Sequence, residues 1–262
     1  MNRIEATLKK LESDGRKALI TYITCGDGGY ETTEAAVLEM IDSGADIIEI
    51  GIPFSDPIAE GPVIQAASHR ALMGGTTLAG TFEMAERLRK KTDVPLIFMM
   101  YMNSIFGFGT ERFFEKCAEV GIDGVIVPDL PYEERDEIKE AADKNNVISI
   151  SLITPASADR IEKIAKDAKG FVYCVSSNGV TGMRSAFKTD FESFISEIKK
   201  YTDIPCAIGF GISGARQAAE IKKYCDGIIV GSAIVDIVGK HGKDSVAEIG
   251  KLTSDLRQAI DS

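Results

Sequence analysis

The chain has 262 residues, 44% hydrophobic and 27% charged, which fits one large globular domain or two small ones. Its formal net charge of −10 argues against a nucleic-acid or anionic-membrane partner, because phosphate backbones require basic patches. No run reaches the roughly 18 apolar residues of a membrane span, and the N-terminus has no apolar signal core. The five scattered cysteines form no C-x-x-C pair, which favours free thiols in a reducing cytoplasm.

Helical and strand patterns alternate along the chain. An amphipathic helix is expected first, over Asn2–Ser13. The expected strands are Ala18–Thr24, Asp46–Ile50, Leu96–Met100, Gly124–Val127, Val147–Ile153, Phe171–Val175, Pro205–Gly209 and Gly227–Val230. The expected helices between and after them are Thr32–Asp42, Pro62–Leu72, Leu78–Lys91, Glu111–Val120, Glu133–Lys144, Ala158–Ala168, Phe191–Lys200, Ala215–Tyr224 and the segment from Ser232 to the end, with a break near Gly239–Gly242.

Eight strands, each followed by a helix, predict an α/β fold with parallel pairing, because each helix returns the chain to the same end of the sheet. Eight such units in about 250 residues indicate a single (β/α)₈ TIM barrel with an extra N-terminal helix. The alternative is an open doubly wound sheet, which usually carries G-x-G-x-x-G after its first strand. The segment Cys25–Gly29 lacks that spacing. No linker divides the chain, so we expect one domain over residues 1–262.

A carboxylate, Glu49, lies among isoleucines near the end of the second expected strand. Burial there is costly unless a partner pairs with the carboxylate or the chemistry uses it. Alternation puts Glu49 on the same face as Ile47, and barrel active sites lie at the carboxyl ends of strands. If that face is the interior, desolvation raises the pKa of Glu49 toward neutrality, as a group that gives and takes a proton requires. The alternative is a glutamate paired with a lysine or arginine.

A second acid, Glu60, lies in the following loop, which is expected to fold over the same mouth. Two carboxylates in different environments can divide acid–base and positioning roles. The alternative for Glu60 is a solvated loop side chain.

Glycines recur after the last three expected strands, at Gly182, at Gly209-Phe210-Gly211 and at Gly231-Ser232. Barrels bind phosphate in the loops after strands seven and eight, through backbone N–H groups and a helix N-terminus. Glycine permits the close approach that a phosphate needs, although any one of these glycines can be a plain turn residue. The pattern favours a small phosphorylated substrate.

Several other reaction classes lack their residues. No expected strand core contains a lysine, so a Schiff-base mechanism has no obvious nucleophile. The only histidines, His69 and His241, lie in helical and polar segments, which argues against a zinc site or a Ser-His-Asp triad. The sequence also has no Asp/His cluster that would indicate a divalent metal site. Proton-transfer chemistry is what remains, and the residues alone do not name its substrate.

Long motifs in the chain resemble the tryptophan synthase α subunit family. They follow one another in family order and spacing over nearly the whole length. The most specific are Glu49-Ile50-Gly51-Ile52-Pro53-Phe54-Ser55-Asp56-Pro57 and Gly61-Pro62-Val63-Ile64-Gln65-Ala66-Ala67. Further matches are Thr21–Asp27, Met100-Tyr101-Met102-Asn103, Val127–Pro131, Gly179–Gly182, Gly209–Ser213 and Val230–Ala233.

The resemblance implies a barrel that cleaves indole-3-glycerol phosphate to indole and glyceraldehyde 3-phosphate without a cofactor of its own. It implies that Glu49 protonates the indole ring at C3 and takes part in the later proton removal from the glycerol hydroxyl. The loop acid Glu60 would contact the indole N–H. The implied partner is the tryptophan synthase β subunit, which holds pyridoxal phosphate, in an α₂β₂ complex. The implied substrate-binding residues are Tyr22, Met100, Val127 and Tyr173 around the site, Thr181 in a closing loop, and Gly182, Gly211, Gly231 and Ser232 at the phosphate.

The sequence departs from the family at Glu60, where aspartate is usual. The carboxylate is kept on a side chain one methylene longer, and a misplacement of about 1 Å can cost around a hundredfold in rate. Ser104 also replaces a common proline in a region that docks on β. Three alternatives therefore stay open beside a working α subunit: a catalytically weakened subunit that mainly activates β, a stand-alone lyase that releases indole, and a barrel isomerase of another phosphorylated metabolite.

Overall fold

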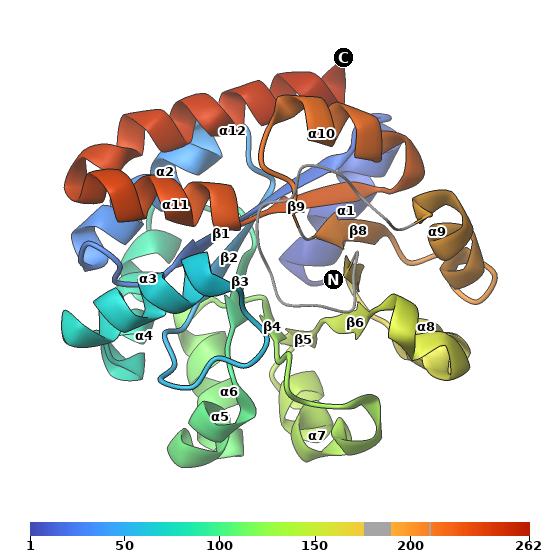
Figure 1. Ribbon diagram of the computed structural model, residues 1–262. Helices are drawn as coiled ribbons and strands as arrows, with labels where there is room; N and C mark the ends of the chain where they lie inside the picture. Colours follow the sequence, from blue (N-terminus) through green and yellow to red (C-terminus); the bar gives the residue numbers. More distant parts are fainter. Residues whose placement is uncertain (176–189, 210) are drawn as a thin grey trace.

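The computed structural model describes residues 1–175, 190–209 and 211–262. Within these ranges, nine parallel strands form one sheet that curls into a nearly closed barrel, with helices around it (Figure 1). The strand order is β5-β4-β3-β2-β1-β9-β8-β7-β6. Apart from β5 and β6, strands that follow one another in the chain are neighbours, because each helical crossover returns the chain to the same edge. The predicted TIM barrel is confirmed.

Most element bounds agree with the sequence patterns within one or two residues. The strands are β1 (Ala18–Thr24), β2 (Ile47–Gly51), β3 (Leu96–Met99), β4 (Gly124–Ile126), β5 (Ile148–Ser149), β6 (Ser151–Ile153), β7 (Val172–Val175), β8 (Cys206–Gly209) and β9 (Gly227–Val230). The α-helices are α1 (Arg3–Ser13), α2 (Tyr30–Asp42), α3 (Pro62–Met73), α4 (Leu78–Arg89), α5 (Met102–Phe108), α6 (Thr110–Val120), α7 (Asp136–Lys144), α8 (Ile161–Asp167), α9 (Phe191–Lys199), α10 (Ala215–Ile221), α11 (Ser232–His241) and α12 (Val246–Asp261).

The expected fifth strand is divided in two. β5 pairs with β4, and β6 pairs with β7. Between them the Ile150 N–H donates to the Val125 carbonyl at 2.9 Å. The segment thus changes partner at Ile150, which explains why nine strands replace the expected eight. Helix α5 was not expected from the sequence; Met102 and Ile105 supply its buried side.

Two apolar clusters show which strand face points inward. Ile20, Ile47, Ile97, Ile126 and Ile229 belong to one cluster, inside the barrel. Their neighbours in sequence join a second cluster together with apolar residues of the surrounding helices. The alternation follows from strand geometry, in which successive side chains point to opposite faces. Glu49 therefore lies on the interior side with Ile47, as its spacing predicted.

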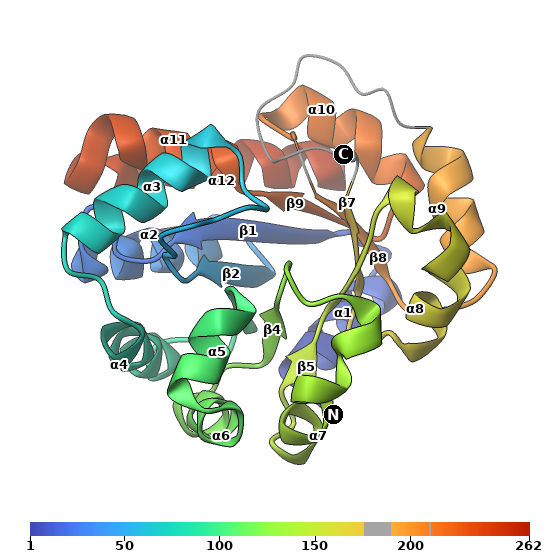
Figure 2. The ribbon, with the colours of Figure 1, turned by 60° about the horizontal axis from the view of Figure 1, so that its bottom comes forward.

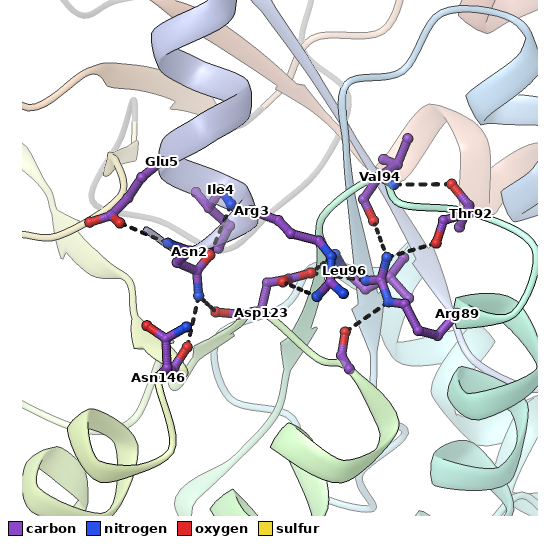
Figure 3. A network of polar contacts seen from close by, with 11 residues as sticks. Asn2, Arg3, Ile4, Glu5, Arg89, Thr92, Val94, Leu96, Asp123 and Asn146 are labelled. Carbon is purple, nitrogen blue, oxygen red and sulfur yellow. Dashed lines mark hydrogen bonds and ion pairs between the residues drawn. The ribbon is translucent and has the colours of Figure 1, made fainter.

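Helix α1 covers the N-terminal end of the barrel. Ile4 packs into the interior cluster, and the Asn2 side chain caps α1 by accepting the Ile4 N–H at 2.9 Å. The Asp123 carboxylate binds Arg3 and Arg89, each at 2.9 Å (Figure 3). With this end sealed, the mouth at the carboxyl ends of the strands is the end available for a ligand. Among the described helices, none is both long and apolar enough to cross a membrane.

Candidate active site

Glu49 is fully buried near the end of β2, between Tyr22 of β1 and Ile97 of β3. Neither carboxylate oxygen has a hydrogen-bond partner among the residues that the structure describes. Among the described residues, Glu49 is therefore not paired with a lysine or an arginine. Burial alone raises the pKa of Glu49 to about 8. At pH 7 this favours the protonated form about tenfold, so the group can donate a proton and later take one back.

A small cavity of about 30 Å³ lies against Glu49. It brings together five of the residues implied by the family resemblance, from four different strand ends. These are Tyr22, Tyr173, Gly211, Gly231 and Ser232, and the remaining lining residues are Ile64, Met99, Ile212 and Ile229. A volume of this size holds about one water molecule, so a substrate requires side chains at the mouth to move apart.

Two tyrosine rings fit beside Glu49 because glycines leave room for them. A Cβ on Gly51 would lie 2.0 Å from the Tyr22 hydroxyl oxygen, and a Cβ on Gly209 would lie 2.6 Å from the Tyr173 ring. Burial also raises the pKa of Tyr22 and of Tyr173, so both hydroxyls stay protonated. The wall around the carboxyl group is therefore uncharged, which preserves the desolvation of Glu49.

Three other lining residues of the cavity have the features of an anion site. Gly211 has φ +81°, a conformation that glycine adopts without strain. Gly231 is the residue before α11, and Ser232 is the first residue of that helix. The first N–H groups of a helix lack partners within the helix and carry partial positive charge. Gly211, Gly231 and Ser232 therefore have the features of backbone donors for a phosphate in the same cavity as Glu49.

Met100 and Val127 are not among the lining residues. Both are buried in the outer cluster, between the strands and the helices. The interior positions on the same strands are Met99, which lines the cavity, and Ile126, which belongs to the interior cluster. Alternation from the inward Ile97 would have identified Met99, since the two are separated by two positions on β3.

Glu60 is held outside this cavity. Its side chain is buried, and the Tyr101 hydroxyl donates a hydrogen bond to Oε2. Tyr101 also accepts the Ala59 N–H at 2.9 Å and stacks on Phe54 at a centroid distance of 4.9 Å. Burial raises the pKa of Glu60, although the hydrogen bond from Tyr101 acts to lower it. The alternative of a solvated loop side chain is wrong.

Tyr101 was overlooked in the sequence, where it appeared only as part of a motif. Its position directly after β3, at the mouth, was the available signal. Thr181 and Gly182 lie outside the described residues. Within the described ranges, no group of three or more His, Cys, Asp or Glu side chains is placed to hold a metal ion.

Comparisons with known proteins identify the family of the chain. The family model described as tryptophan synthase alpha chain matches residues 8–261. The tryptophan synthase alpha chain of Clostridium kluyveri is 47% identical over 263 residues, covering 100% of both chains. The solved alpha chain of Legionella pneumophila is 36% identical with a TM-score of 0.91, covering 100% of this chain and 98% of that one.

A chain of Mycobacterium tuberculosis tryptophan synthase is 32% identical with a TM-score of 0.89, covering 99% of this chain and 98% of that one. Proteins of this family work with a β chain. The chain belongs to the tryptophan synthase alpha chain family and is a lyase that cleaves indole-3-glycerol phosphate.

Proposed function

We propose that Glu49 performs both proton transfers of the cleavage. The protonated carboxyl donates its proton to C3 of the indole ring. The resulting carboxylate accepts the proton of the glycerol hydroxyl as the carbon–carbon bond breaks, which releases indole and glyceraldehyde 3-phosphate and restores the acid. The observation that carries this proposal is the fully buried carboxyl group without a hydrogen-bond partner among the described residues. A free carboxyl with a pKa near neutrality suits a group that must change protonation state twice per cycle.

The substrate would lie across the mouth with its phosphate at Gly211, Gly231 and Ser232. Three features support this orientation: the left-handed turn at Gly211, the N-terminus of α11 and the shared cavity with Glu49. Tyr22 and Tyr173 would then flank the indole. We assign further substrate contacts to Thr181 and Gly182 on the family resemblance alone.

Glu60 supports a second candidate, an α subunit with weakened catalysis of its own. In the family resemblance this acid contacts the indole N–H, but here its carboxylate binds Tyr101 and does not line the Glu49 cavity. Only Oε1 is free of Tyr101, so contact of Oε2 with the indole would require breaking that hydrogen bond. In this second candidate, the hydrogen bond from Tyr101 holds the Glu60 side chain and is its main role.

The deciding experiment is a lyase assay of the purified chain on indole-3-glycerol phosphate, alone and with its β chain. Indole release that β stimulates strongly supports a working α subunit. High activity that β leaves unchanged supports a stand-alone lyase, and no indole from folded protein in either case refutes the proposal. The Glu60→Asp variant separates the second candidate: a large gain in turnover supports weakened catalysis, while equal or lower turnover indicates a site adapted to glutamate.

We further propose that residues 1–262 form one catalytic domain that assembles with the β subunit as α₂β₂ in the cytoplasm. Ile58 and Phe106, on segments after β2 and β3, are 74% and 53% exposed, which supports an apolar docking face at the mouth. All five cysteines are buried free thiols, which suits a reducing compartment. Sedimentation of the mixture with β should show a species of α₂β₂ mass, and Phe106→Asp should weaken it; two separate species would contradict the assembly.

A further inference from the structure

A second cavity of the described structure lies away from Glu49, on the flank of the barrel between α7 and α8. It has a volume of about 320 Å³, within the range of small-molecule sites. In Figures 1 and 2, α7 and α8 stand apart on either side of the β5–β6 segment. By contrast, α6 packs on α7 and α8 packs on α9. The cleft between α7 and α8 is therefore a gap in the outer helical layer.

The back wall of the cleft explains why the helices do not close on it. Ser149 and Ser151 alternate with Ile148 and Ile150 of the interior cluster, so they occupy outward positions of this segment, and both line the cleft, as does Ile150. On other strands the same outward positions carry apolar residues that pack beneath helices, such as Ile48 on β2 and Phe98 on β3. Two serines supply little apolar surface to attract a helix, but they do supply hydrogen-bonding groups.

Ion pairs cross the cleft, in which α7 and α8 do not pack on each other. Arg135, before α7, binds Asp167 at the end of α8, and Arg160, before α8, binds Glu133 at 3.0 Å. These pairs are substantially exposed, and exposed ion pairs stabilise a fold only weakly. The rim can therefore open at little cost to admit a molecule.

The charge of the lining favours an anion. Four cationic side chains line the cleft against two carboxylates, and once Glu133, the partner of Arg160, is counted, the local excess is one positive charge in a chain whose net charge is −10. The cations are Arg135, Lys139, Arg160 and Lys169, and the carboxylates are Asp143 and Asp167. The floor is apolar, with Val127, Leu130, Ala142 and Ile164 among its residues.

We propose that this α7–α8 cleft is a second ligand site, separate from the catalytic mouth, for a small amphiphilic anion. The apolar body of the ligand would fill the floor, and its carboxylate or sulfonate group would meet the basic rim and the serine hydroxyls. Apolar surface removed from water provides the affinity, and charge-assisted hydrogen bonds fix the orientation.

The test uses 8-anilinonaphthalene-1-sulfonate as the probe, with the catalytic mouth filled by a non-cleavable indolylalkyl phosphate. Because the chain has no tryptophan, probe fluorescence is measured without tryptophan background. Calorimetry should give one probe per chain. The neutral 1-anilinonaphthalene should bind at least about tenfold more weakly, the loss expected when a charge-assisted hydrogen bond is absent.

Variants locate the probe. Arg160→Gln should weaken binding about tenfold, whereas the matched Arg216→Gln, which removes another arginine paired with a glutamate, should not change it. Ser151→Phe should abolish binding by filling the cleft; if that variant does not fold, Arg160→Gln decides alone. Equal binding by all folded variants, or no binding by the wild type, overturns the proposal. Displacement of the probe by the β chain also overturns it, because the cleft would then be a protein interface.

Discussion

Replacing Glu49 by glutamine tests whether the buried carboxyl group has the environment described above. The side chain keeps its shape but no longer titrates. In the wild type, burial raises the folded-state pKa to about 8 from the ordinary value of 4.5, so the protonated carboxyl favours folding. Its contribution to stability is fully present below pH 4.5 and is lost as the pH rises through about 8. The Glu49→Gln variant does not lose stability in this way, because its side chain does not titrate.

The magnitude follows from the two pKa values. At about 1.36 kcal/mol per pH unit between them, the wild type loses about 4 kcal/mol relative to Glu49→Gln from pH 5 to pH 9. Urea unfolding of both proteins at pH 5, 7 and 9, followed by far-UV circular dichroism, measures this difference. All other titrating groups are common to both proteins and cancel. A difference that changes by less than about 1 kcal/mol over this range would show that Glu49 titrates as in the unfolded chain.

Three further substitutions, one of them with a matched control, address the mouth of the barrel and its sealed N-terminal end. Tyr101→Phe should lower the free energy of unfolding by about 1–3 kcal/mol in urea titrations, because the buried Glu60 carboxylate loses its donor; unchanged stability would mean that another group replaces Tyr101. Gly51→Ala should reduce both stability and lyase turnover, since its Cβ would lie 2.0 Å from the Tyr22 hydroxyl, whereas Gly214→Ala, with open space around it, should do neither. Asp123→Asn should cost about 3 kcal/mol of stability by removing the shared partner of Arg3 and Arg89 (Figure 3), and a cost near zero would count against a structural role for this network.

The sequence predicted the barrel and the position of Glu49 because both depend on strong local signals. Strand–helix alternation fixes parallel pairing, and an isolated acid in an isoleucine-rich strand is conspicuous. The division of β5 from β6 was not predicted, since a change of pairing partner at Ile150 leaves no mark in an apolar run.

The substrate contacts implied for Met100 and Val127 stay predictions. Both were chosen from motif positions, whereas the pleat of the strands turns Met99 and Ile126 inward and places Met100 and Val127 in the outer cluster. The hydrogen bond between Tyr101 and Glu60 joins residues 41 positions apart. Only the folded arrangement of two loops at the mouth brings them together, so no local pattern could predict it.

The central claim is that Glu49 transfers the protons of the reaction, and the lyase turnover of Glu49→Gln measures it most directly. Steady-state kinetics on indole-3-glycerol phosphate should be determined for both proteins with the β chain present. We expect kcat to fall by about 10²–10⁴, the usual contribution of a positioned acid–base group, with KM within about threefold because the phosphate contacts remain. A Glu49→Gln variant that retains most of the wild-type kcat would contradict the account.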